Sequence, residues 1–158
     1  MKNDYNNFSE HKLGRALNLT KPTYFLDSTT LIHAIDKSAK YHKECLNIIS
    51  KAAKGEINTA TSLETLEETL FILSKLTSPS TAIRVTHDYL RMTKIKKNEL
   101  NLAIFEHALE IMEITPLKRP KDAINVATMV EQGIPKIVSE DKEYDKIDLI
   151  QRVHPIDL

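Results

Sequence analysis

The chain has 158 residues, of which 41% are hydrophobic, so it is long enough for one domain with a single buried core. Its 22 basic and 22 acidic residues cancel, which argues against binding nucleic acid through bulk positive charge alone. A lone cysteine, Cys45, excludes an internal disulfide, and no apolar run approaches the roughly 20 residues of a membrane span. The first twelve residues lack the apolar stretch of a secretory signal, so a soluble, cytoplasmic protein is expected.

The beginning of the chain differs in composition from the rest. Residues 1–22 are polar and rich in asparagine, and we expect an N-terminal extension there, followed by one domain over 23–158. Within the extension, Ser9 is placed to cap a short helix, and a frayed tail is the alternative.

Further along, short β-prone runs alternate with longer segments of helical periodicity. Thr23–Leu26 is the first predicted strand, and helices are predicted over Thr30–Asp36 and Lys40–Lys54. Glu56–Thr61 is the second strand, and Leu63, Leu66, Leu70 and Leu73 fall at helical spacing after it. The remaining segments are a helix (Thr81–Met92), a basic connection (Lys94–Asn98), a helix (Glu99–Ile111), a strand (Glu113–Leu117), a helix (Pro120–Gln132) and two strands (Lys136–Ser139 and Arg152–Ile156).

Several residues mark the predicted ends of these elements. Ser28 or Thr29 is expected to cap the first helix, and Ser62 the helix after the second strand. Pro120 suits the first position of its helix, and Gly133 suits the position after the last. Strands separated by helices predict parallel crossover units, with helices on both faces of one sheet. The predicted class is therefore a single α/β domain.

Four acidic residues fall close to the ends of predicted strands or the starts of predicted helices. Asp27 directly follows the first strand, and Asp141 comes two residues after the fourth. Asp122 lies in the first turn of its helix, and Glu68 about two turns into the helix after the second strand. Because sites in parallel sheets form beyond the carboxyl ends of the strands, these carboxylates are expected to meet.

Each acid also has a simpler interpretation when it is taken alone. Asp27 suits a helix cap, Glu68 a solvated helix surface and Asp122 a helix N-terminus, while Asp141 and Asp145 suit turns. Together they favour a site for a hard divalent cation, because clustered carboxylates repel one another and Mg²⁺ prefers oxygen ligands. The six histidines show no spacing typical of a zinc site.

The same residues carry a resemblance to a known family, the PIN domain, and in size to the VapC-type toxins. The resemblance runs over Thr23–Pro155. It rests on four segments in order, none of them specific alone: YFLDSTTLI, TSLETLEETL, KDAINVATMVEQGI and KIVSEDKEYDKI. It implies a three-layer α/β/α sandwich with a central parallel sheet of about five strands.

The resemblance also implies an activity and a site. The activity is an endoribonuclease dependent on Mg²⁺ or Mn²⁺, plausible as the toxin of a type II toxin–antitoxin pair, with RNA as substrate, an antitoxin as partner and a homodimer as assembly. The implied catalytic and metal-binding residues are Asp27, Glu68, Asp122 and Asp141, with Asp145 as an outer metal-binding member and Ser28 and Ser139 as hydroxyls that orient them. Glu67 is the main rival of Glu68, because both flank the buried leucine face.

Two basic sets are candidates for contact with RNA phosphates, although lysine runs are usually solvated surface. They are Lys94, Lys96 and Lys97, and Lys118, Arg119 and Lys121. Tyr144, beside a proposed ligand, is a candidate for base stacking.

Two other functions stay open from the sequence. One is a PIN fold kept as an RNA-binding or scaffold module with weak catalysis. The other is a metal phosphohydrolase on a different α/β fold, although the chain lacks the DxD pattern that many such enzymes use.

Overall fold

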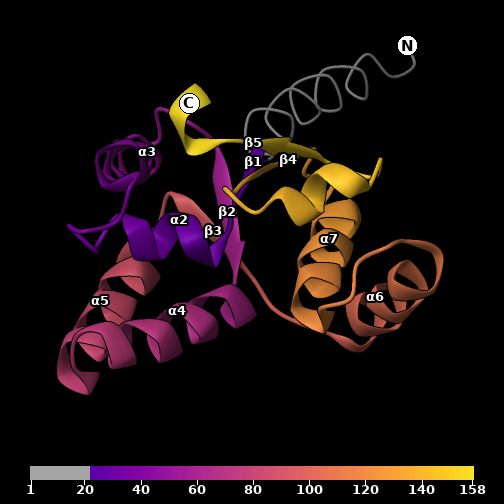
Figure 1. Cartoon of the computed structure of the whole chain (residues 1–158), viewed down its shortest axis with the longest axis horizontal. Coiled ribbons are helices and arrows are strands. Elements are labelled where there is room, and N and C mark those ends of the chain that lie inside the picture. Colours follow the sequence, from indigo (N-terminus) through magenta and orange to yellow (C-terminus); the bar gives the residue numbers. More distant parts are fainter. Residues whose placement is uncertain (1–21) are drawn as a thin grey trace, which may run out of the picture.

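The computed structural model describes residues 22–158, and it has three layers with a parallel sheet in the middle (Figure 1). The sheet order is β3-β2-β1-β4-β5, and every neighbouring pair is parallel. The five strands are β1 (Tyr24–Leu26), β2 (Thr59–Ser62), β3 (Ile95–Asn98), β4 (Lys136–Val138) and β5 (Gln151–Val153). This confirms the predicted α/β sandwich.

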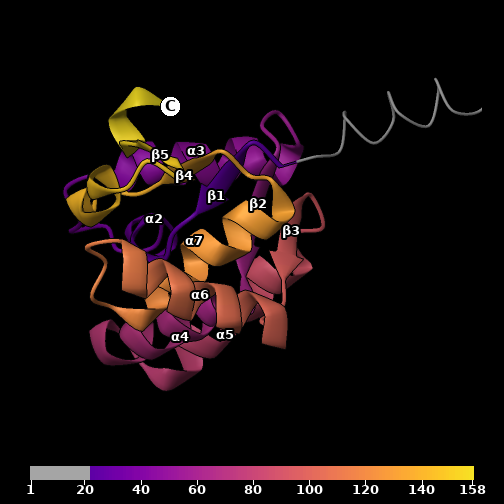
Figure 2. The same cartoon turned by 90° about the vertical axis from the view of Figure 1, so that its right-hand side faces the viewer.

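The order of the strands explains where the helices lie. The chain builds the sheet outward from β1 to β3, then returns to place β4 on the other side of β1. Because parallel crossovers keep one hand, this reversal moves the helices to the opposite face. Figures 1 and 2 show this division. On one face are α2 (Ser28–His33), α3 (His42–Lys54), α4 (Leu63–Leu76) and α5 (Pro79–Arg91); on the other are α6 (Leu102–Ile114) and α7 (Pro120–Gln132).

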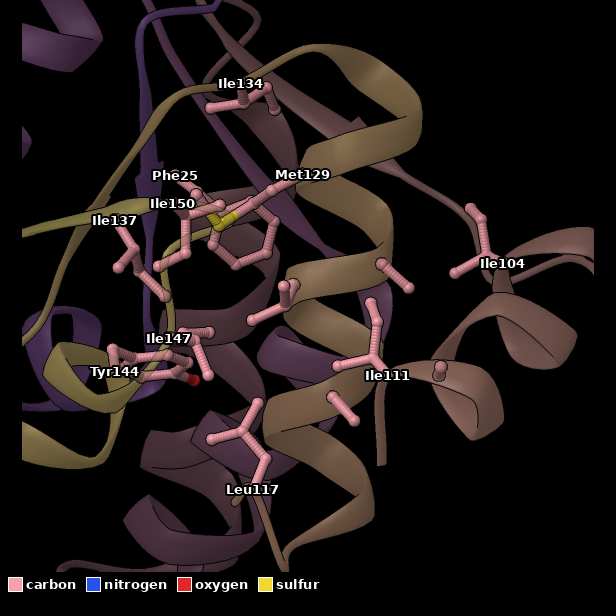
Figure 3. Packing of buried hydrophobic residues seen from close by; sticks show 14 of the residues in the cluster. Phe25, Ile104, Ile111, Leu117, Met129, Ile134, Ile137, Tyr144, Ile147 and Ile150 are labelled. Carbon is pink, nitrogen blue, oxygen red and sulfur yellow. The ribbon is translucent and has the colours of Figure 1, made fainter. Parts of the chain in front are cut away.

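Each face of the sheet has its own apolar core. Successive strand residues point to opposite faces, so Phe25 and Ile137 pack against α6 and α7, while Leu26 and Val138 pack against the helices of the other face. Figure 3 shows the first of these cores, with Phe25 close to Met129. Burial on both faces fixes the register of β1 and β4, and with it the position of the residues that follow them.

Three of the four predicted helix-end assignments are confirmed. The Ser62 hydroxyl accepts a hydrogen bond from the Thr65 amide, as a cap should. Pro120 begins α7, and Gly133 ends it in the left-handed region with φ of 61°. The predicted cap of the first helix is wrong: Asp27 occupies the cap position, and Ser28 is already helical.

Two predictions about the middle of the chain are also wrong. Lys94–Asn98 is not a connection, because β3 runs through it with Ile95 and Asn98 buried. β3 is an edge strand, and its lysines face outward. Their charges hid its strand pattern in the sequence. Glu113–Leu117 is not a strand, because α6 continues to Ile114. The predicted number of strands is correct only because these two errors cancel.

The last predicted strand, Arg152–Ile156, is confirmed as a strand but not in its full length. β5 ends at Val153, and Pro155 begins a short 3-10 helix, η2 (Pro155–Asp157), instead of continuing the strand. The predicted extension and the helix capped by Ser9 lie outside the described residues, apart from Pro22 at their junction. Among residues 22–158, no helix combines the length and apolar character that crossing a bilayer requires.

Candidate active site

Asp27 lies at the carboxyl end of β1, at the point where the sheet order reverses. Its side chain is only 2% exposed. One carboxylate oxygen accepts hydrogen bonds from the Ser139 hydroxyl at 2.8 Å and the Thr29 hydroxyl at 3.2 Å. The other lies 3.5 Å from the Asn125 amide nitrogen, which donates to it. Asp27 occupies the N-cap position of α2, but its side chain makes no cap hydrogen bond, so helix capping does not account for its carboxylate.

Asp122 is held in the first turn of α7 and is almost fully buried. The guanidinium of Arg119 donates to one carboxylate oxygen at 2.7 Å, and the Tyr144 hydroxyl donates to the other at 3.3 Å. Burial raises the pKa of Asp122 above its usual range, although Arg119 and Lys121 act in the opposite direction. A buried carboxyl with a raised pKa beside other acids is typical of functional sites.

Glu68 reaches the same region from α4, which covers the opposite face of the sheet from α7. Its carboxylate contacts the ammonium of Lys121, which lies 4.0 Å from an Asp27 oxygen. The same ammonium donates to the Ser28 hydroxyl at 3.1 Å. Glu67 is exposed, so the structure brings Glu68 and not its rival to the other acids.

Asp141 closes the arrangement from the segment after β4. Its carboxylate contacts the guanidinium of Arg119, and its amide donates to the Ser139 hydroxyl at 3.1 Å. Burial acts to raise the pKa of Asp141, but hydrogen bonds from the Glu143 amide and Arg119 outweigh it and hold the pKa below its usual range. Asp141 also begins the 3-10 helix η1 (Lys142–Lys146).

The four acids are therefore linked by shared partners into one continuous series that runs from Glu68 to Asp122. Glu68 and Asp27 share Lys121, and Asp122 and Asp141 share Arg119. Ser139 joins Asp27 to Asp141. We call these four carboxylates the acidic ring. Its members come from β1, α4, α7 and the segment after β4, as the order of the elements predicts.

Of the three other predicted site residues, only Ser139 contacts a carboxylate of the acidic ring. Ser139 contacts Asp27 directly, as an orienting hydroxyl would, whereas Ser28 contacts Lys121 instead. Asp145 is exposed and forms a two-point ion pair with Arg152, at 2.7 and 2.8 Å, with none of the shared partners of the acidic ring. The structure thus does not bring Asp145 into the ring.

Sequence reasoning missed one central residue, Asn125. It is fully buried on α7, donates to the Tyr144 hydroxyl at 3.3 Å and accepts from the Thr65 hydroxyl at 3.2 Å. A polar amide among Ala123, Val126 and Ala127 was the signal that could have revealed it, because buried amides need partners.

Tyr144 has a different role from the predicted one. Its ring packs in the core with only 1% of the residue exposed, so it does not present a face for base stacking. Figure 3 shows its hydroxyl pointing toward α7. Burial and the nearby carboxylates of Asp27 and Asp122 raise the pKa of Tyr144 well above its usual value, so the hydroxyl stays protonated and donates to Asp122.

The donor set of the acidic ring suits a hard divalent cation, because all four members offer carboxylate oxygens. In the described part of the chain, however, no three acidic, His or Cys side chains already stand together in a metal-binding arrangement. Lys121 and Arg119 lie between the acids instead. A cation entering the ring would therefore have to displace at least one of these side chains.

The fold and the acidic ring place this chain among α/β domains that have a carboxylate site at the point where the strand order of the sheet reverses. The sequence profile of the PIN domain matches residues 24–150, and the chain belongs to that family. No curated protein matches the chain significantly by sequence.

Solved structures of VapC toxins and VapBC complexes have the same fold. VapC20 of Mycobacterium tuberculosis, described as a toxin cleaving the sarcin-ricin loop, gives a TM-score of 0.67 at 17% identity over 77% of this chain and 92% of its own. DNA-bound VapBC2 of Rickettsia felis gives a TM-score of 0.63 at 14% sequence identity, over 83% of this chain and 97% of its own. DNA-bound VapBC of Salmonella typhimurium gives a TM-score of 0.63 at 16% sequence identity, over 85% of this chain and 98% of its own. At these identities the likeness concerns the fold.

Proposed function

We infer that the chain is an endoribonuclease dependent on Mg²⁺ or Mn²⁺, and that it is the toxin of a type II toxin–antitoxin pair. The observation that carries this proposal is the acidic ring, in which carboxylates from four separate elements converge where the sheet order reverses. Membership of the PIN domain family supports it. So does the fold shared with VapC20, described as cleaving the sarcin-ricin loop.

Under this proposal, Asp27, Glu68, Asp122 and Asp141 form the catalytic and metal-binding set. The cation, when bound, supplies Lewis acidity and an activated water for phosphodiester hydrolysis. The residues around the ring fix the geometry. Ser139 and Thr29 orient the Asp27 carboxylate through its Oδ2 atom, and the buried Tyr144 hydroxyl holds the Asp122 carboxylate through Oδ1. Asp145 has at most an outer role, through its partner Arg152.

RNA would approach the ring over the start of α7. Lys118 and Arg119 are exposed there, and Lys121 is partly exposed. Their positive charges offset the repulsion between the acids and the RNA backbone. Because the chain as a whole has no net charge, this attraction for phosphates has to come from a local group of basic side chains. We assign the phosphate contacts to this set and not to Lys96, which donates to Gln132 at the opposite end of α7.

An antitoxin is the proposed partner, because solved relatives of this fold include toxin–antitoxin complexes. An apolar groove of about 280 Å³ supports this partner, since a short amphipathic segment could bury its apolar face there. Its lining, between α2, α3 and α5, includes Ile35, Leu46, Ile49, Val85 and Met92. A homodimer is proposed from the family resemblance.

One observation favours a second function, an RNA-binding or scaffold module with weak catalysis. Lys121 and Arg119 already neutralise part of the acidic ring, as they would in a site that no longer needs a metal. Against this, all four acids are present, and burying a carboxylate such as that of Asp122 costs stability, which a use in the site would explain.

Cleavage of a broad RNA pool separates these two functions. We expect the purified chain, freed of any antitoxin, to cleave the pool with Mn²⁺ or Mg²⁺, to leave 5′-phosphate ends and to stop in EDTA. Cleavage that persists in EDTA would indicate a contaminating ribonuclease. A chain that binds both Mn²⁺ and RNA but never cleaves would contradict the nuclease and support the scaffold.

A further inference from the structure

The first turn of α7 places two cations inside a site that is otherwise acidic. Arg119 precedes the helix and Lys121 is its second residue, and each contacts two members of the acidic ring. Their side chains differ in freedom. The Arg119 side chain is 58% exposed and can turn toward solvent, whereas that of Lys121 is only 28% exposed.

The Lys121 ammonium has two hydrogen-bond acceptors and one further carboxylate oxygen at ion-pair distance. It contacts the Glu68 carboxylate, donates to the buried Ser28 hydroxyl at 3.1 Å, and lies 4.0 Å from the Asp27 carboxylate. In a two-metal site, the two cations lie about 3.5–4 Å apart and share carboxylate ligands. The Lys121 ammonium lies between Glu68 and Asp27, the two carboxylates that a second cation on this side of the site would share.

The charge of the site supports the same conclusion. The four carboxylates bring four negative charges, and Lys121 together with one divalent cation in the place of Arg119 returns three of them, so a charge of −1 remains. With Lys121 still in place, a second divalent cation would give the site a net positive charge, and without it the cation would first have to expel Lys121 from the Glu68 carboxylate and the Ser28 hydroxyl. Both changes oppose binding of the second ion.

We propose that the site binds a single divalent cation, held by Asp27, Asp122 and Asp141, and that the Lys121 ammonium permanently takes the place of a second cation at Glu68. This inference rests on the proposed function and refines it, because it makes Glu68 the partner of Lys121 and not a metal ligand. The ammonium cannot activate water as a Lewis acid. It serves as a fixed positive charge for the scissile phosphate.

The stoichiometry of Mn²⁺ binding tests this proposal without requiring activity. The EDTA-treated chain is titrated with Mn²⁺, and free ion is followed by electron paramagnetic resonance. We expect one Mn²⁺ per wild-type chain. Lys121→Met keeps the aliphatic stem and removes the charge, so we expect it to bind two, the first on the order of tenfold more tightly. The matched control, Lys118→Met, changes an exposed lysine just before the helix and should still bind one.

A second variant guards against misfolding of the first. Glu68→Gln should still bind one Mn²⁺, because Glu68 is not a ligand in this proposal. Two ions of similar affinity on the wild-type chain would overturn the proposal, as would a single ion on folded Lys121→Met or none on folded Glu68→Gln. If the wild-type chain binds no Mn²⁺ at all, the proposed metal-dependent function itself is contradicted.

Discussion

Asp27→Asn is expected to slow RNA cleavage on the order of a thousandfold, the largest effect that we predict for activity. Asp27 is the residue that connects the acidic ring, since it shares Lys121 with Glu68 and Ser139 with Asp141. Replacing its charge removes a ligand at the centre of the proposed metal site. RNA binding should persist, because the phosphate contacts come from lysine and arginine. Cleavage rates at saturating Mn²⁺ and binding by gel shift measure the two effects separately.

Asp145→Asn is the matched control for this variant. It makes the same chemical change in an exposed aspartate that pairs with Arg152 outside the ring. Exposed ion pairs contribute little to stability, so we expect cleavage within about threefold of the wild-type rate. Equal losses in both variants would show that the ring has no special role. A wild-type rate for Asp27→Asn would remove the basis of the proposed mechanism.

Asn125→Ala is expected to lower the free energy of unfolding by about 2–4 kcal/mol, the largest effect that we predict for stability. Asn125 is fully buried and has hydrogen-bond contacts with Asp27, Thr65 and Tyr144. Truncation leaves these polar groups without a partner and opens a small cavity. Because a domain is stable by only about 5–15 kcal/mol, this loss should be clear in urea unfolding.

Thr128→Ala provides the comparison on the same helix. Thr128 is also buried, but its hydroxyl donates only to the carbonyl of Ile124 one turn earlier, at 2.8 Å, so we expect a loss of about 1 kcal/mol. Combining Asn125→Ala with Tyr144→Phe should cost less than the sum of the two single changes, because both remove the same hydrogen bond. Strictly additive losses, or equal losses for Asn125→Ala and Thr128→Ala, would contradict the described network.

The parts of the fold that could be predicted from the sequence have signals that depend on neighbours in the chain. β1 and β4 are short apolar runs because both of their faces are buried, and α7 begins at a proline and ends at a glycine. β3 was missed because it is an edge strand whose lysines mask its alternation. The end of α6 was misplaced because Ile114 and Thr115 have β propensity, which the helix overrides.

The four acids of the candidate site could be predicted from the sequence, whereas their contacts could not. Parallel strands share a carboxyl edge, so the order of the elements is sufficient to bring Asp27, Asp122 and Asp141 together. The side-chain directions that place Lys121 between Glu68 and Asp27 depend on how α4 and α7 lie against the sheet, which no sequence pattern gives. Asn125 was missed, although its amide stands out on an apolar helix face.

The location of bound metal tests the central claim most directly. Crystals of the chain soaked in Mn²⁺ and measured near the manganese absorption edge should show an anomalous peak bounded by Asp27, Asp122 and Asp141, within about 2.5 Å of their carboxylate oxygens. Arg119 should then have turned away from Asp122. An empty ring at saturating Mn²⁺, with Arg119 still joining Asp122 to Asp141, would contradict the account of the acidic ring as a metal site.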